Sequence, residues 1–252
     1  MHLGRLAVVL SCLALPATTL AEPGVADLVR AYPGQFAGIE GNDLVWQDGT
    51  RMPISDGIAG KDFDTLLDQP DIDDMFVFPY RPGEPDGPPG RNEDPGRIRY
   101  EPLFTRMYGD CEAGEVAPQM RDVAWLKGKV RFTTANGAAD ALEAVVADLR
   151  MLPSEMTRYL VPSAGTYNCR RIAGTDRRSM HAYGAAIDIN TEHADYWMWA
   201  KPVDGAYPYR NRIPYVIVEA FERHGFVWGG KWYHYDTMHF EYRPELLPGP
   251  GG

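Results

Sequence analysis

The chain has 252 residues, of which 44% are hydrophobic and 24% are charged. These values exclude collagen-like, coiled-coil and wholly disordered chains, and the length suits one medium domain or a domain with a smaller appendage. The formal net charge of -10 argues against a protein that binds nucleic acid or anionic membranes through positive charge.

The first 21 residues have the pattern of a secretory signal peptide. Arg5 supplies a short positive region, residues 6–15 form an apolar run, and Thr19-Leu20-Ala21 has the small residues of a cleavage site. The apolar run is only half of the roughly 20 residues that span a bilayer, and no later stretch comes close. We therefore predict a secreted or periplasmic protein, cleaved after Ala21, with no integral membrane segment. A lipoprotein anchor on Cys12 remains an alternative.

The two cysteines that remain after cleavage are Cys111 and Cys169. An even pair in an oxidising compartment favours a disulfide. It would close a loop of 58 residues (169 minus 111), which stabilises a fold by about 4 kcal/mol in the chain-entropy model. Two buried free thiols are the alternative, and two cysteines alone cannot make a structural zinc site.

Residues 22–96 predict an N-terminal extension that contains β-structure. The segments 44–46 and 51–54 read as the two strands of a hairpin, with Asp48-Gly49 in its turn. Residues 79–96 hold six prolines and four glycines, which is too many for a helix or a central strand. This stretch predicts a long loop that separates the extension from a second domain, residues 97–252.

The second domain mixes strands with two predicted helices. Residues 129–133 predict a strand, and Asn136 is a plausible cap for a helix over residues 138–152, whose apolar side chains recur at helical spacing. A second helix is predicted to begin at Pro214 and to stop at Gly225, followed by a strand over residues 226–228. This order of elements predicts an α+β fold.

Residues with catalytic chemistry gather in two short segments. In the segment 179–190, alternation from Ala186 places Asp188 on one face of a strand, and Gly184 lets the backbone turn between that strand and His181. The segment 228–241 offers His239 as a further nitrogen ligand and Asp236 or Glu241 as a free carboxylate. The other histidines, His193, His224 and His234, are interpreted as structural residues.

Two neutral histidines and one aspartate favour zinc over calcium or magnesium, which prefer oxygen ligands. They leave a fourth position for a water, whose pKa zinc brings from 15.7 to about 7, so that it can attack a carbonyl at neutral pH. A nearby carboxylate can then transfer protons. Spacing alone does not decide whether Asp236 or Glu241 does so, because Glu241 shares the predicted strand face of His239 and Asp236 lies just before it.

The two segments resemble a known family. The pattern Ser-x-His-x-x-Gly-x-Ala-x-Asp from Ser179 to Asp188, followed by Asp-x-x-His-Phe-Glu at 236–241, is similar to the LAS zinc metallopeptidases, in particular the VanY-type D-alanyl-D-alanine carboxypeptidases. The resemblance covers roughly residues 125–245. The segment 165–170 is also similar to extensin-like C-terminal domains.

The resemblance implies an antiparallel sheet flanked by helices, with zinc on His181, Asp188 and His239. It implies that Asp236 is the general base and that peptidoglycan stem peptides are the substrate. In the family, an arginine upstream of the first ligand has a catalytic role, in which it polarises the scissile carbonyl or holds the intermediate, and Arg170 matches its place. The serine two residues before that ligand can contact the substrate, and Ser179 matches it. Arg171 is the second candidate for the arginine, and Arg177 and Arg178 crowd the same stretch. Glu241 is expected to support a zinc ligand.

From the residues and the resemblance we predict an exported zinc peptidase that acts as a D-alanyl-D-alanine carboxypeptidase. An endopeptidase that cuts the stem peptide at an L-alanyl-D-glutamate type of bond is one alternative. The other is a non-catalytic, zinc-containing binding module of the cell envelope, since the superfamily includes a signalling domain. The oligomeric state is not predicted.

Overall fold

The structure of the chain is a computed structural model that describes residues 22–248. The predicted signal peptide, its cleavage site and Cys12 lie outside the described residues. Between residues 22 and 248 there is no helix with the length and apolar character needed to cross a membrane.

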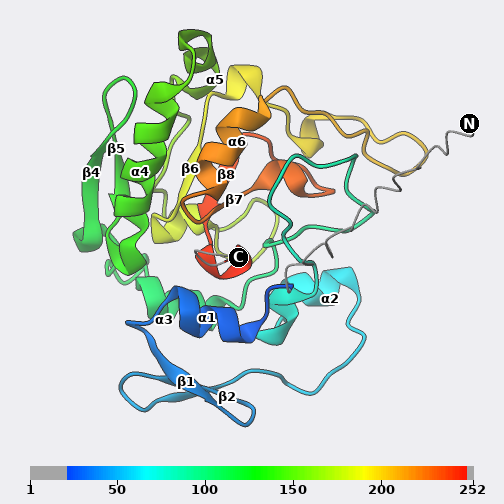
Figure 1. The fold of residues 1–252 in the computed structure, drawn as a ribbon. Coiled ribbons are helices and arrows are strands. Elements are labelled where there is room, and N and C mark those ends of the chain that lie inside the picture. Colours follow the sequence, from blue (N-terminus) through cyan, green and yellow to red (C-terminus); the bar gives the residue numbers. More distant parts are fainter. Residues whose placement is uncertain (1–21, 249–252) are drawn as a thin grey trace, which may run out of the picture.

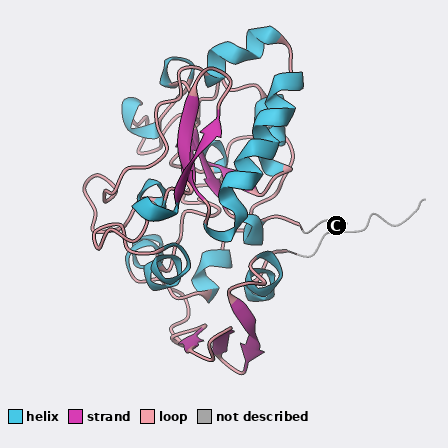
Figure 2. Ribbon diagram, turned by 90° about the vertical axis from the view of Figure 1, so that its left-hand side faces the viewer, coloured by secondary structure: helices cyan, strands magenta, loops and turns pink. Residues whose placement is uncertain are grey.

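The fold is of the α+β class, as predicted, with helices around small antiparallel sheets (Figures 1 and 2). Its helices are α1 (Val25–Ala31), α2 (Phe63–Asp68), α3 (Glu101–Tyr108), α4 (Ala138–Met151), α5 (Thr157–Leu160) and α6 (Tyr215–Glu222). Its strands are β1 (Phe36–Glu40), β2 (Asp43–Trp46), β3 (Arg51–Pro53), β4 (Met120–Ala124), β5 (Lys129–Thr133), β6 (Ala186–Asp188), β7 (Phe226–Trp228) and β8 (His239–Tyr242).

The strands form three antiparallel groups. β1, β2 and β3 make a small sheet in the N-terminal extension, β4 and β5 form a hairpin, and β8 lies between β6 and β7 in the sheet that carries the site. Helix α4 packs against α6 and against the β4–β5 hairpin, while α6 packs against β7. The helices therefore cover the sheets with apolar faces such as that of α4, where Leu142, Val145, Val146 and Leu149 are all buried.

Several predicted elements are confirmed. The hairpin over residues 44–54 is present as β2 and β3, and Gly49 supplies the positive φ of +82° that its turn needs. The strand over residues 129–133, the helix over residues 138–152 and the strand over residues 226–228 are also present, within one residue.

The predicted caps of the two helices are less accurate. Asn136 does not cap α4, because Gly137 occupies the cap position and no side chain bonds there. The Asn136 side chain instead accepts a hydrogen bond from Gln35 at 2.8 Å. Asn136 therefore makes a tertiary contact with the N-terminal extension in place of the predicted helix cap. Pro214 is the residue just before α6, and the helix ends at Glu222, ahead of Gly225.

The N-terminal extension contributes to the same hydrophobic core as the rest of the chain, and Leu28, Phe36 and Trp46 belong to the cluster that also contains residues of α4 and β8. At one end of the molecule in Figure 1, α1 lies close to the C-terminal segment, and Tyr32 donates a hydrogen bond to Glu245 at 2.6 Å. The stretch rich in proline and glycine, residues 79–96, also packs onto residues 232–243. Many contacts therefore join residues 22–96 to residues 97–248, across the predicted domain boundary.

Residues 93–99, the end of that stretch and the three residues after it, are here called the strap because they bond to residues within 232–243. The carbonyl of Glu93 accepts from the backbone N–H of Tyr233, and the carbonyl of Pro95 accepts from the indole of Trp232 at 2.7 Å. Asp94 is fully buried and accepts from the His234 ring at 2.8 Å, which gives His234 the structural role expected of it. The strap therefore holds the segment that leads into β8.

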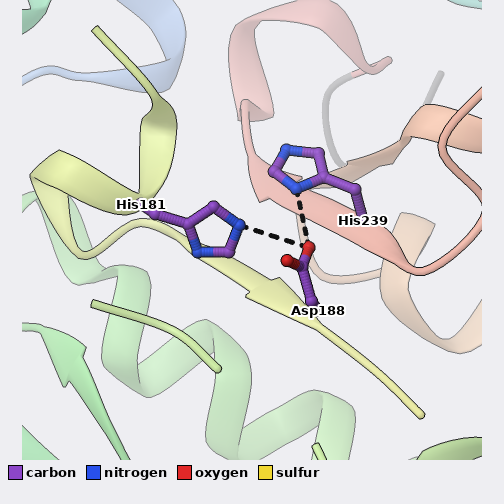
Figure 3. Close-up of side chains that lie close together, drawn as sticks. All are labelled: His181, Asp188 and His239. Atoms are coloured by element: carbon purple, nitrogen blue, oxygen red, sulfur yellow. Dashed lines mark hydrogen bonds and ion pairs between the residues drawn. The ribbon is translucent and has the colours of Figure 1, made fainter. Parts of the chain in front are cut away.

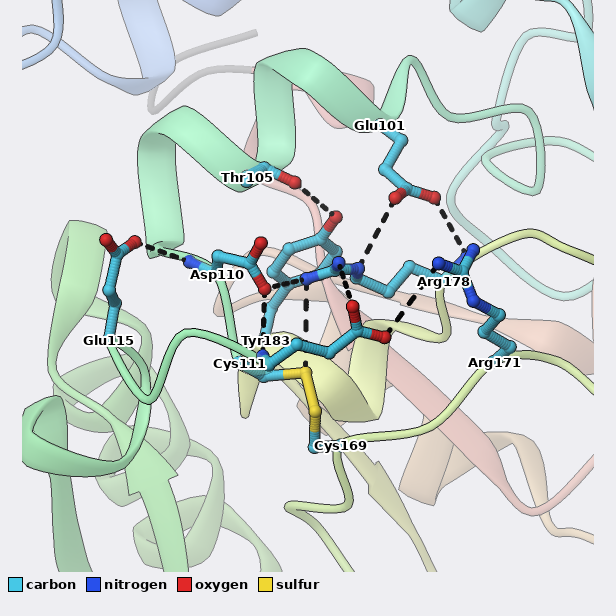
Figure 4. The surroundings of a disulfide bond; sticks show 10 residues. Glu101, Thr105, Asp110, Cys111, Glu115, Cys169, Arg171, Arg178 and Tyr183 are labelled. Carbon is cyan, nitrogen blue, oxygen red and sulfur yellow. Dashed lines mark hydrogen bonds and ion pairs between the residues drawn. A yellow bond between two sulfur atoms is a disulfide. The ribbon is translucent and has the colours of Figure 1, made fainter.

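The disulfide between Cys111 and Cys169 is present, and it ties the segment after α3 to the segment before the first site motif (Figure 4). The loop that it closes has a sequence separation of 58. We expect the double variant Cys111→Ala/Cys169→Ala to lose about 4 kcal/mol of unfolding free energy, because the unfolded chain regains the entropy of the open loop. Urea unfolding checks this, and an unchanged midpoint would contradict it.

Candidate metal centre

Three elements bring His181, Asp188 and His239 together. β6 and β8 are paired so that Asp188 and His239 are direct cross-strand partners, and directly opposed residues project on the same face of a sheet. His181 lies in the 3-10 turn Met180–Tyr183, which leads into β6. Figure 3 shows the two imidazoles directed at the same carboxylate oxygen of Asp188 from different directions.

The turn that carries His181 is shaped by local sequence. The hydroxyl of Ser179 accepts a hydrogen bond from the backbone N–H of His181 at 3.3 Å and so caps the turn. Gly184 ends the turn with φ +67°, a conformation that L side chains avoid. A Cβ at this position would also lie 2.4 Å from the sulfur of Met120.

The distances within the cluster suit a single ion. Nε2 of His181 lies 3.2 Å from Oδ1 of Asp188, and Nδ1 of His239 lies 3.0 Å from the same oxygen. One donor atom from each of the three residues lies within 4.8 Å of the other two. Both imidazoles are buried, while the Asp188 side chain is 22% exposed, so the cluster has an open side.

Hydrogen bonds around the cluster fix which imidazole nitrogens carry protons. Nδ1 of His181 lies 2.6 Å from the carbonyl oxygen of Thr166, and a carbonyl only accepts, so this nitrogen is the donor. Nε2 then presents a lone pair to Asp188, and it is a buried nitrogen without a hydrogen-bond partner within residues 22–248. A lone pair that faces a carboxylate in this way favours a positive charge between them, supplied by a proton or by a metal ion.

Glu241 supports His239 from the side away from Asp188. Its Oε2 lies 3.3 Å from Nε2 of His239 and accepts from Arg99 at 2.7 Å, while Oε1 lies 3.3 Å from Arg243. Burial opposes the charge of Glu241, but Arg99 and His239 outweigh burial and hold the pKa of this carboxyl well below its usual range. Glu241 therefore stays ionised and orients the His239 ring, as partners of metal ligands commonly do.

The electrostatics of the cluster favour a positive charge between the carboxylates. Burial acts against a charged His239, yet the bonds to Asp188 and Glu241 dominate and raise its pKa to about 10. Burial likewise opposes the charge of Asp188, and its contacts with both histidines hold its pKa far below the usual range. Two imidazole nitrogens and one carboxylate oxygen are a donor set that fits zinc.

Asp236 lies in the turn that begins β8, where its backbone carbonyl accepts from the N–H of His239 at 3.1 Å. Its Oδ1 is buried and lacks a hydrogen-bond partner among the described residues. Burial is the main cause that raises its pKa to about 6, against the charges of the two histidines. The position of Asp236 is set by Gly229, since a Cβ on that glycine would come within 2.7 Å of the Asp236 carbonyl oxygen.

The two predicted arginines, Arg170 and Arg171, do not contact the three clustered residues. Arg170 is exposed, and its guanidinium donates to the carbonyl of Arg171 at 3.4 Å. Arg171 is exposed as well; it bonds to the carbonyl of Asp176 and lies 3.8 Å from Glu112. Neither arginine has a contact with the three clustered residues that would assign it a role, and both roles stay predictions.

The sequence did not single out Thr166, Arg97 or Arg99. Thr166 contributes through its backbone carbonyl, which no side-chain pattern reports. Arg99 reaches Glu241 across 142 positions of sequence, and Arg97 lies over the Trp232 ring at 5.9 Å, next to His239. In the sequence, Arg97 and Arg99 are only two arginines just after residues 79–96, and this position does not show which side chains they contact.

The positive φ of Gly184 gives a testable expectation. We expect Gly184→Ala to lower the free energy of unfolding by about 1 kcal/mol or more, because a side chain is strained in this conformation and displaces Met120. Chemical denaturation measures the loss. Gly87→Ala is the control, since this exposed glycine has open space around it and an ordinary φ. Equal stability of both variants would contradict the expectation.

The geometry defines an α+β protein with a His-Asp-His cluster whose donor atoms could hold a metal ion. A protein-family model described as D-alanyl-D-alanine carboxypeptidase matches residues 173–242. Over this segment the chain is similar to that peptidase family, which supports the resemblance of the two motifs. The segment contains His181, Asp188, Asp236 and His239, whereas Arg170 and Arg171 lie just outside it. The comparisons found no significant match among curated proteins or solved structures.

Proposed function

We propose that the chain is a zinc-dependent peptidase that hydrolyses peptidoglycan stem peptides, as a D-alanyl-D-alanine carboxypeptidase. The observation that carries the proposal is the convergence of His181, Asp188 and His239, with the lone pair of His181 Nε2 directed at Asp188. The family match over residues 173–242 supports the substrate class.

His181, Asp188 and His239 would hold the zinc ion. When bound, zinc polarises a carbonyl and lowers the pKa of a water, so that peptide hydrolysis can proceed at neutral pH. Thr166 and Glu241 fix the two imidazole rings through the nitrogens that face away from Asp188. The ligand atoms are therefore positioned before an ion binds, which lowers the entropic cost of binding.

Asp236 is proposed as the residue that moves protons. A general base needs a pKa close to the working pH, and burial already raises the pKa of Asp236 to about 6. Its Oδ1 has a lone pair that no described residue occupies. In the proposed reaction Asp236 accepts the proton of the attacking water and returns it to the amine of the leaving D-alanine.

Arg170 is proposed as a catalytic residue that steadies the oxyanion, with Arg171 as the alternative, and Ser179 is proposed to bind the substrate. A planar guanidinium can form two charge-assisted hydrogen bonds to an oxyanion. Arg170 is exposed and contributes to the electrostatics of Tyr196, whose backbone pairs with that of Asp236. Because Arg170 is exposed, its guanidinium is accessible to a bound peptide.

We also propose that the protein is exported and begins at residue 22 after cleavage. The disulfide between Cys111 and Cys169 supports this, because such bonds persist in oxidising compartments. N-terminal sequencing of protein recovered from the periplasm or the medium tests the cleavage site.

The activity is tested by incubating the purified protein and zinc with a muramyl pentapeptide and identifying the products by mass spectrometry. Release of free D-alanine is the expected result. Cleavage within the stem would instead identify an endopeptidase. Zinc binding without turnover on any wall fragment would favour the binding module and overturn the proposal.

A further inference from the structure

A cavity of about 660 Å³ lies beside the proposed metal centre. It is enclosed by α2, the segment that leads into α3, and the loop 174–178. Four arginines line it, namely Arg97, Arg99, Arg177 and Arg178. Arg97 and Arg99 come from the strap. The N-terminal extension contributes α2, including Asp64 and Asp68, so the cavity depends on the extension.

Arg178 and Arg97 are occupied by partners within the protein. Arg178 lies 2.5 Å from Asp110, 3.3 Å from Glu101 and 3.4 Å from Glu112 (Figure 4). Arg97 donates to the buried Asp94 at 2.6 Å. These two residues shape the wall of the cavity, but their charges are neutralised.

Arg99 and Arg177 retain unused donors. Within residues 22–248 their Nε atoms are buried and have no hydrogen-bond partner. The side chains of Arg99 and Arg177 are only 11% and 23% exposed, and the carboxylate nearest to Arg177 is that of Asp68 at 3.5 Å. Burial lowers the pKa of both arginines, and repulsion between the neighbouring guanidiniums lowers it further. An anion placed between them would relieve both costs.

The outer part of the same cavity is acidic. Asp64, Asp68 and Asp176 also line it and are exposed, so they lie nearer to solvent than the arginines. A ligand that carries only negative charge would be repelled on entry. A ligand with a carboxylate and an adjacent ammonium group can satisfy the inner guanidiniums and the outer carboxylates together.

The cavity is connected to the proposed metal centre through one carboxylate. Arg99 bonds to Glu241 at 2.7 Å, and Glu241 lies 3.3 Å from the His239 ring. Tyr183, which also lines the cavity, belongs to the same turn as His181. A group bound to Arg99 would therefore be linked to the His239 ring through the side chain of Glu241.

We infer that this cavity binds the zwitterionic end of an amino-acid side chain, one that carries both a carboxylate and an ammonium group. The carboxylate would lie on Arg99 and Arg177, and the ammonium group would point toward Asp64 and Asp68. The inference rests on the proposed function for its source, since a wall peptide would supply such a group. It assigns to the N-terminal extension a part in substrate selection.

The test is isothermal titration of the purified protein with three probes. These are 2,6-diaminopimelate, which carries two zwitterionic ends, pimelate, which has the same carboxylates without amines, and inorganic phosphate. We expect 2,6-diaminopimelate to bind at least about tenfold more tightly than either of the others. We expect Arg177→Met to weaken its binding about tenfold or more, because a charge-assisted pair of hydrogen bonds is lost.

Matched variants separate this site from the proposed metal centre. Arg177→Lys keeps the charge without the planar fork and should lose less affinity, while Arg150→Met, an exposed arginine on α4, should bind as wild type does. Asp236→Asn should also bind the probe normally. A wild-type protein that binds the probe but hydrolyses no wall peptide would refute only the proposed function. Equal binding by wild type and Arg177→Met, or phosphate as the preferred probe, would overturn the inference.

Discussion

Replacement of His181, Asp188 or His239 by alanine is expected to abolish zinc binding and to reduce peptide hydrolysis at least about a thousandfold, since bound zinc contributes several kcal/mol to the transition state. Each variant removes one of the three donors that lie within 4.8 Å of one another. A tetrahedral zinc site with only two protein ligands and two waters binds far more weakly than one with three. Treatment of the wild type with a chelator should reproduce the loss, and added zinc should reverse it.

The measurements are the zinc content per protein molecule and the rate of D-alanine release. His193→Gln serves as the control, because His193 packs against the Tyr159 ring at 5.2 Å and has no contact with the cluster. It should keep both zinc and activity. A His181→Ala protein that retains stoichiometric zinc and full turnover would show that the cluster is not the metal centre.

The sequence predicted the cluster well because its signals are local. Gly184 and Ser179 shape a turn through their own backbone conformation and hydrogen bonds, and alternation along β6 places Asp188 on one face. The cross-strand pairing of Asp188 with His239 was not evident from spacing. It depends on the register of β6 and β8, which are 51 positions apart at that pair.

The surroundings of the cluster were not predictable in the same way. The strap was read as a separating loop because proline and glycine prevent regular structure there, but that composition says nothing of tertiary contacts. Its carbonyls and side chains bond to Trp232, His234 and Arg243 instead. Irregular backbone that is buried must find such partners, and their identity emerges only when the chain has folded.

These contacts link the strap, which joins the extension to the second domain, to the chemistry of the site. Arg99 keeps Glu241 ionised, Glu241 orients His239, and the strap holds the segment from which Asp236 projects. Removal of residues 22–96 would therefore alter the proposed metal centre as well as any substrate contacts. A point variant in the strap is a sharper probe than a truncation, because it leaves the shared core intact.

Asp236→Asn is expected to lower the rate of hydrolysis by about a hundred- to ten-thousandfold while zinc binding stays unchanged. Asparagine has nearly the same shape, but its amide cannot accept and return a proton at neutral pH. For the wild type, the rate should fall as the pH drops and Asp236 becomes protonated. Burial raises the pKa of Asp236 to about 6, and a bound cation lowers it again by favouring the anion, so half of the activity should be lost at or below pH 6.

The same experiment on Glu241→Gln decides between the two carboxylates that spacing left open. Glu241 contacts Arg99, Arg243 and His239 and is fully buried, so its neutralisation should weaken zinc affinity about 10- to 100-fold and destabilise the fold by leaving buried arginines unpaired. At saturating zinc its folded fraction should still turn over and keep the acid limb of the pH profile. If instead Asp236→Asn keeps full activity and Glu241→Gln alone removes the acid limb, the roles of the two residues must be exchanged.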